Sequence, residues 1–124
     1  MQNISEKPKG ILKHRSYQFA LDIIKFLDTL DKKDYSVQVI SKQLLRSATS
    51  IGANIIEAQA GSSKKDFANF YNYALKSANE TKFWLGLLYD SGKAGSTDSL
   101  MKEAVELSNM LAASVLTLKE KRIF

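Results

Sequence analysis

The sequence predicts an all-α protein: an antiparallel up-down-up-down four-helix bundle. Only six glycines and one proline occur among the 124 residues, which disfavours the turn-rich sheets of sandwiches and barrels. Apolar residues recur every three or four positions along four segments, the spacing of one face of a helix. Short polar connections join these segments, so consecutive helices are expected to run antiparallel. A chain of this length with 44% hydrophobic residues fills one core and not two.

Residues 1–15 are predicted to form a flexible basic arm, followed by a single bundle domain over residues 16–124. The arm holds the only proline, Pro8, followed by Lys9 and Gly10, and it shows no helical apolar period. Residues 1–16 carry a net charge of +3 out of the chain's total of +5. Such an arm attracts polyanions, although a net charge of this size also serves solubility alone.

The first helix is predicted over residues 16–31, with Ser16 as its N-cap. One face is apolar at Phe19, Ala20, Ile23, Ile24, Leu27 and Leu30. Tyr17, Leu21 and Phe26 widen that face beyond the stripe of about 100° that a simple surface helix needs. The excess predicts a contact with another subunit.

The second helix is predicted from a cap at Ser36 to about Ala60. Its apolar face consists of Ile40, Leu44, Ser47, Ala48, Ile51, Ile55 and Ala58. Small residues thin its middle, and Gly52 costs roughly 1 kcal/mol relative to alanine in a helix interior. We interpret Gly52 as a point where another backbone approaches closely, and a ligand-binding site is the alternative.

The third helix is predicted to follow an N-cap at Ser63 and to end before Gly92, a residue suited to the left-handed C-terminal position. It has two neighbouring stripes of apolar or small residues, so other helices are expected to cover it on two sides. The first stripe contains Phe67, Tyr71, Ala74, Ala78, Thr81, Leu85 and Leu88, and the second contains Phe70, Ser77, Trp84 and Leu87.

The last helix is predicted to start after Ser96 or Thr97 and to end with the cations of residues 119–122, at the negative end of its dipole. Its stripe is Leu100, Met101, Ala104, Leu107, Leu111, Val115 and Leu118. The apolar content exceeds what one core needs. Tyr73 and Phe83, on a second face of the third helix, therefore predict an oligomer interface, against ordinary surface aromatics as the alternative.

Residues 46–58 (RSATSIGANIIEA), residues 63–67 (SKKDF) and then Phe70, Ala74, Ser77 and Glu80 carry a family resemblance. They resemble the bacterial four-helix-bundle family of proteins encoded by intervening sequences in 23S rRNA genes. The accessory variability determinant of diversity-generating retroelements is similar. The resemblance spans roughly residues 15–120. It implies a homopentamer with a basic surface that binds nucleic acid or a nucleic-acid enzyme. Residues 59–62 (QAGS) depart from the family, which more often has glycine and a basic residue there.

The sequence predicts no catalytic residue, no metal site and no cofactor. His14 is the sole histidine, it lies in the expected arm, and cysteine is absent. Both facts disfavour nucleophile–histidine pairs, thiolate metal sites and di-iron centres. A magnesium-dependent nucleotide hydrolase would need its carboxylates clustered. Glu57, Glu80, Glu103 and Glu106 supply that alternative, against the simpler reading of Glu103 and Glu106 as a solvated face.

Glu57 and Glu80 are predicted to be structural. Both lie near apolar stripes, and a buried carboxylate without partners costs several kcal/mol. We therefore expect both to be partly buried and hydrogen-bonded, either to Arg46 or Lys of another chain or to hydroxyls such as those of Ser50 and Ser77.

Basic residues supply candidate contacts for a polyanion: Lys13, Arg15, Lys42, Arg46, Lys64, Lys65 and Lys76. The sequence has no recognition-helix signature, so any binding is expected to be directed at the phosphate backbone and to weaken with salt.

The leading hypothesis is a cytoplasmic, non-enzymatic homo-oligomer, a pentamer by resemblance, that binds RNA or a nucleic-acid enzyme. The absence of cysteine agrees with a reducing compartment. No apolar run approaches the length of a membrane span, and no signal peptide is expected. The alternative is a protein–protein adaptor or structural module without a nucleic-acid role, and a carboxylate-dependent nucleotide hydrolase ranks third.

Overall fold

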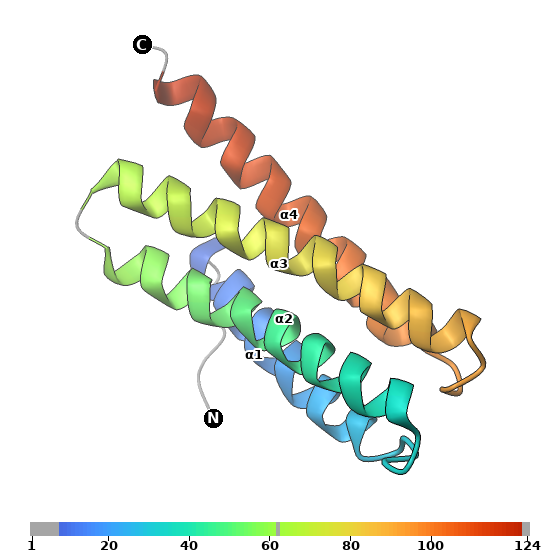
Figure 1. Cartoon of the computed structure of the whole chain (residues 1–124). Helices are drawn as coiled ribbons and strands as arrows, with labels where there is room; N and C mark the ends of the chain where they lie inside the picture. Colours follow the sequence, from blue (N-terminus) through green and yellow to red (C-terminus); the bar gives the residue numbers. More distant parts are fainter. Residues whose placement is uncertain (1–7, 62, 123–124) are drawn as a thin grey trace.

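A computed structural model describes residues 8–61 and 63–122 of the chain. It contains α1 (Pro8–Leu27), α2 (Tyr35–Ala60), α3 (Lys64–Asp90) and α4 (Asp98–Arg122). Figure 1 shows that successive helices run in opposite directions. Each helix contacts the next along the chain, and α4 also contacts α1. The predicted all-α four-helix bundle is confirmed.

The first helix begins earlier than predicted, at Pro8, and ends at Leu27. Ser16 is not its cap but a buried residue inside it, whose hydroxyl donates to the backbone oxygen of Lys13 at 3.0 Å. The prediction of a flexible arm is therefore wrong for residues 8–15, and residues 1–7 lie outside the described part. Proline fits a first helical turn because the missing N–H has no partner there. Leu12 is buried among residues far away in the sequence, which local periodicity does not reveal.

In the three later helices, the ends agree with the sequence at three places and differ at one. Ser63 caps α3, since its side chain accepts from the Asp66 amide at 3.0 Å. Gly92 has a φ of +74°, and α4 begins directly after Thr97, as expected. The predicted cap at Ser36 is wrong: Asp34 caps α2 by accepting from the Val37 amide at 3.1 Å.

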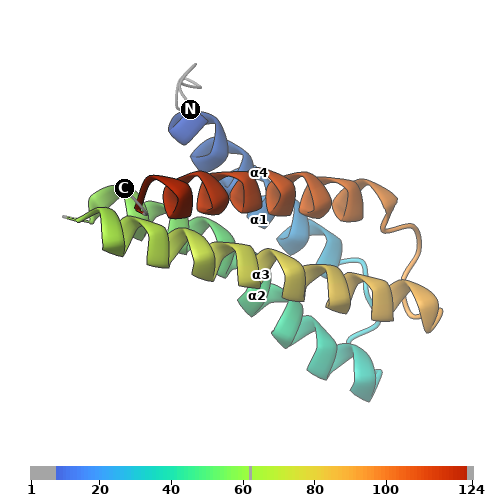
Figure 2. The same ribbon diagram turned by 90° about the horizontal axis from the view of Figure 1, so that it is seen from above.

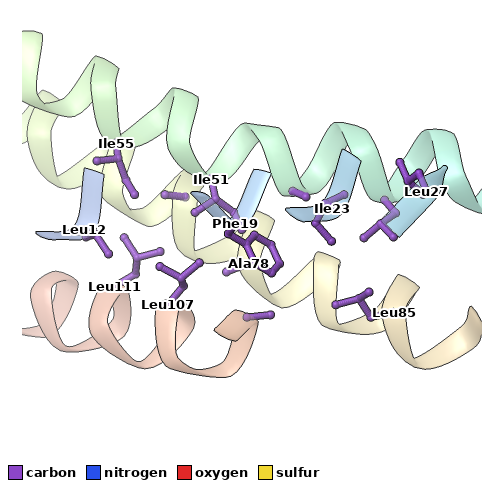
Figure 3. Close-up of a cluster of buried hydrophobic side chains, with 14 of the residues drawn as sticks. Leu12, Phe19, Ile23, Leu27, Ile51, Ile55, Ala78, Leu85, Leu107 and Leu111 are labelled. Carbon is purple, nitrogen blue, oxygen red and sulfur yellow. The ribbon is translucent and has the colours of Figure 1, made fainter. Parts of the chain in front are cut away.

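Side chains from all four helices form one core (Figure 3). α1 supplies Leu12, Phe19, Ile23 and Leu27, α2 supplies Ile51 and Ile55, α3 supplies Ala78 and Leu85, and α4 supplies Leu107 and Leu111. α1 crosses α4 obliquely (Figure 2). One polar pair is buried between α2 and α3, where the Thr81 hydroxyl donates to the Ser47 hydroxyl at 2.9 Å.

Candidate functional site

Arg15 is fixed to α4 by two carboxylates. Its Nε and Nη2 donate to the two carboxylate oxygens of Glu103 at 2.9 and 2.6 Å, and Nη2 also donates to Glu106 at 3.0 Å. These hydrogen bonds, those to Glu103 first, raise the pKa of Arg15 above its ordinary value. The expectation that Arg15 belongs to a mobile arm is wrong, because α1 extends through it. Its charge is used within the protomer and is not presented freely to phosphate.

Arg46 and Glu80 join α2 to α3 in a second ion pair. The same carboxylate oxygen of Glu80, Oε2, accepts from the Trp84 indole N–H at 2.9 Å. Arg46 also donates to the Gln43 side chain through Nη2 at 2.9 Å. The Glu80 side chain is 35% exposed, so its predicted partial burial is confirmed, with Arg46 of the same chain as its partner.

Glu57 does not follow the same prediction. Its side chain is exposed, and it forms no ion pair with any residue of the described segments. Glu57 lies two positions after the buried Ile55, which turns it by about 200° around the helix axis and away from the core. The expectation of partial burial is therefore wrong for Glu57.

The remaining predicted cations are lysines. Lys42, Lys64, Lys65 and Lys76 are exposed and Lys13 is half-buried, and none of them pairs with a carboxylate within residues 8–61 and 63–122. They do not form one compact patch. Lys64 and Lys65 lie at the start of α3, Lys76 lies near its middle, and Lys42 lies towards the other end of the hairpin on α2. The structure thus spreads unpaired positive charge along the α2–α3 hairpin.

An apolar groove of about 810 Å³ runs along the outer side of α1 and α2. Its lining includes Tyr17 and Leu21 from α1 and Gly52, Ala53 and Ile56 from α2. Tyr17 is 65% exposed and Ile56 is 48% exposed. A second hollow of about 430 Å³, which includes apolar side chains, lies on the same helix pair. The surplus apolar residues expected on the first helix are thus found at the surface. Sequence reasoning missed the α2 half of the groove, because Ala53 and Ile56 fall outside the stripe that packs in the core.

The outer face of α3 also carries exposed apolar side chains. Tyr73, Phe83 and Leu87 are 50%, 57% and 38% exposed. The Tyr73 ring stands edge-on to Phe70 at 6.1 Å between centroids, and the Phe83 ring stands edge-on to Trp84 at 4.9 Å. Each of these two aromatics therefore contacts a neighbouring ring on the same helix.

The glutamates proposed for a hydrolase lie in three separate places. Glu80 pairs with Arg46 between α2 and α3, Glu103 and Glu106 pair with Arg15 between α1 and α4, and Glu57 stands alone. Within the described segments, no three histidine or acidic side chains are grouped so that they could hold a metal ion.

None of the helices, as far as the chain is described, has an apolar stretch long enough to cross a membrane.

Comparisons with known proteins identify relatives of known fold. The sequence model of a family described as 23S rRNA-intervening sequence protein matches residues 10–113. A crystal structure of a protein of unknown function from the S23 ribosomal protein family of Bacteroides thetaiotaomicron VPI-5482 is 38% identical in sequence. The similarity covers 88% of this chain and 98% of that one, with a TM-score of 0.78. No curated protein matches the chain.

Proposed function

Because this chain belongs to the 23S rRNA-intervening sequence protein family, we propose that it is a non-enzymatic, homo-oligomeric bundle that binds RNA through its phosphate backbone. A pentamer is the assembly that the family resemblance implies. The RNA contacts are assigned to lysines of the α2–α3 hairpin, together with Lys13. The cytoplasm is the compartment in which such a protein would act.

The contrast between paired and unpaired cations carries the RNA part of this proposal. Arg15 and Arg46 are engaged by carboxylates of their own chain. Lys42, Lys64, Lys65 and Lys76 instead point to solvent without such partners in the described segments. Lysine ammonium groups are point charges that suit phosphate oxygens, whereas base edges are read mostly by arginine and amide side chains. The arrangement therefore favours binding that depends on charge and not on sequence.

Exposed apolar surface supports the assembly part. Isolated surface apolar residues are ordinary, but the groove between α1 and α2 is lined by several neighbouring ones, including Tyr17, Leu21, Ala53 and Ile56. A second copy would remove this surface from water. Repeating the hairpin lysines in each copy would also multiply the contacts available to one RNA.

Two measurements test the proposal. Native mass spectrometry gives the number of chains in the particle, and a particle built from rings of five chains is the expected result. A gel-shift titration with 23S rRNA fragments at about 50 and 200 mM salt gives the affinity, which we expect to fall steeply with salt. An intact oligomer without any RNA shift at the lower salt would contradict RNA binding and favour the adaptor alternative. A monomer would contradict the assembly.

Matched variants assign the contacts. The triple substitution Lys42→Gln, Lys64→Gln and Lys65→Gln is expected to weaken RNA binding and to flatten its salt dependence. The control neutralises three other exposed lysines, at positions 25, 33 and 102, which have no carboxylate partners in the described segments. Equal loss in the two triple variants would mean that only net charge matters and that the hairpin is not the binding surface.

A further inference from the structure

The outer face of α3 carries a stripe of six residues that are exposed in the described protomer, except that Glu80 is partly covered by Arg46 of α2. Asn69, Tyr73, Lys76, Glu80, Phe83 and Leu87 follow one another at steps of four and three, the spacing of a helix seam that packs on another helix. Five of them are exposed, and Glu80 is partly exposed. The stripe spans about 27 Å of helix at 1.5 Å per residue. The buried stripe of the same helix contacts α2 and α4, so this one faces outwards.

The stripe is symmetric about position 78. Position 73 mirrors 83, position 76 mirrors 80, and position 69 mirrors 87. In an antiparallel pair of identical helices related by a twofold axis at that position, mirrored residues face each other. Aromatic Tyr73 would then meet aromatic Phe83, and the cation Lys76 would meet the anion Glu80. A parallel arrangement in register would instead place each charged residue against its own copy.

We propose that a second copy of this chain packs antiparallel on the outer face of α3, about a twofold axis near position 78. Tyr73 packs on Phe83 of the second copy, and Lys76 donates to Glu80 of the second copy. Each contact occurs twice, because the axis repeats it.

Charge complementarity within the structure supports this occupant. Arg46 and Trp84 both donate to Oε2 of Glu80, and within the described protomer Oε1 of Glu80 accepts no hydrogen bond. Lys76 has no carboxylate partner in the described segments of its own chain. The seam thus presents one free acceptor and one free donor at mirrored positions, between two aromatic rings.

Each aromatic anchor already contacts another ring of its own helix in the protomer. Phe70 supports Tyr73, while Trp84 supports Phe83 and is itself held by Glu80. Side chains that already contact a neighbouring ring have less freedom to lose when an interface forms. Tyrosine and tryptophan are also enriched at the centres of protein interfaces.

This contact rests on the self-association part of the proposed function and adds a second interface to it. A contact about a twofold axis cannot close a ring of five chains. The α3 contact would therefore join two rings. The groove between α1 and α2 would form the contact between neighbouring chains within each ring. The two parts can fail separately, because a ring without the α3 contact still has more than one chain.

Cross-linking tests the geometry, since the chain has no cysteine of its own. Two single-cysteine variants, Asn69→Cys and Leu87→Cys, are mixed and oxidised, and a disulfide between the two different chains is expected to predominate. The control mixes Tyr17→Cys, on α1, with Leu87→Cys. Predominant 69–69 and 87–87 dimers would indicate a parallel contact and overturn the proposal, as would cross-linking no greater than in the control.

A charge exchange tests the pairing by solution mass. Lys76→Glu and Glu80→Lys are each expected to halve the particle mass when alone, because like charges then face each other. An equimolar mixture of the two variants is expected to restore the full mass, since both mirrored pairs become complementary again. The control is Arg46→Gln, which removes the ion pair between Arg46 and Glu80 within one chain but leaves Lys76 and Glu80 unchanged. This variant is expected to keep the full particle mass. Failure of the mixture to recover would overturn the pairing.

Phe83→Asp separates this inference from the proposed function. We expect half the wild-type mass and unchanged helix content by circular dichroism. An assembled wild type whose mass is unaffected by Phe83→Asp overturns the α3 contact alone. Dissociation of Phe83→Asp to single chains also overturns it, because α3 would then belong to the ring. A wild type that is already monomeric overturns both proposals.

Discussion

Ser16 of α1 lies against Gly52 of α2 where the two helices meet. The Ser16 hydroxyl is 3.2 Å from the point that a Cβ atom on Gly52 would occupy, closer than ordinary van der Waals contact, and the Ser16 Cβ is 3.6 Å from the same point. Ser16 is almost fully buried, so its side chain has little room to move away. The glycine that weakens α2 locally thus permits the approach of α1, and close packing is the explanation that the structure supports.

A double-mutant cycle tests this relationship. Gly52→Ala gains helix propensity worth about 1 kcal/mol but places a methyl group against the Ser16 hydroxyl. With Ser16→Ala present, only an ordinary contact remains. Gly52→Ala is therefore expected to be more stabilising in the Ser16→Ala background than in wild type, by up to about 1 kcal/mol. Urea unfolding of the four proteins measures the difference, and equal effects in both backgrounds would argue against a tight contact.

Arg15→Gln removes the ion-pair link from α1 to Glu103 and Glu106 on α4. These side chains are 29% to 47% exposed, so solvent screens the interaction and the expected loss of stability is about 1 kcal/mol or less. Lys25→Gln on the same helix is the control, because Lys25 has no carboxylate partner in the described segments. Urea unfolding at low salt and at about 1 M salt should show a smaller Arg15→Gln effect at high salt. If the loss of stability in Arg15→Gln were the same at both salt concentrations, the side chain would stabilise the fold by packing and not by its charge.

Asp34 gives the bundle a dependence on acid pH. Its hydrogen bond to Lys93, followed by that to the Val37 amide, lowers the pKa of this carboxyl below its ordinary value. The ordinary pKa of an aspartate, about 3.9, applies to the unfolded chain, and the lowered pKa applies to the folded protein. The ionised carboxylate therefore contributes its full stabilisation above a pH of about 3.9. This stabilisation is lost as the pH falls through the lowered pKa. Asn also caps helices but does not titrate. Asp34→Asn is therefore expected to lose less stability than wild type between pH 6 and pH 3 in urea titrations, whereas equal losses would exclude the Asp34 charge as a contributor.

Gly92 and Gly95 form a matched pair in the α3–α4 connection. Gly92 has a φ of +74°, a conformation that L-residues adopt at a cost of about 1–2 kcal/mol, and both sites have open space around them. Gly92→Ala is therefore expected to lower the unfolding temperature, while Gly95→Ala is expected to leave it unchanged or raise it slightly. Thermal melts followed by circular dichroism make the comparison, and equal melting temperatures would contradict a need for glycine at position 92.

The sequence anticipates most of the bundle but only part of the candidate site. Helical periodicity predicts the buried stripe of α3 and the small-residue face of α2, and the cap at Ser63 follows from local chemistry. The same reasoning misplaces the start of α1, because Leu12 gains its burial from helices that lie far away in the sequence. It also gives Glu57 and Glu80 the same role, although only Glu80 lies within reach of Arg46.

The sequence by itself determines where each helix points its apolar and polar side chains, because 3.6 residues per turn fix those directions locally. It thereby determines the bundle and the surplus of apolar surface. Only the tertiary structure decides which charges meet. Arg15 and Glu103 are 88 positions apart, and the crossing of α1 over α4 brings them together. The close approach of α1 to α2 at Gly52 shapes the groove between these two helices, since helix positions in space depend on how whole surfaces pack.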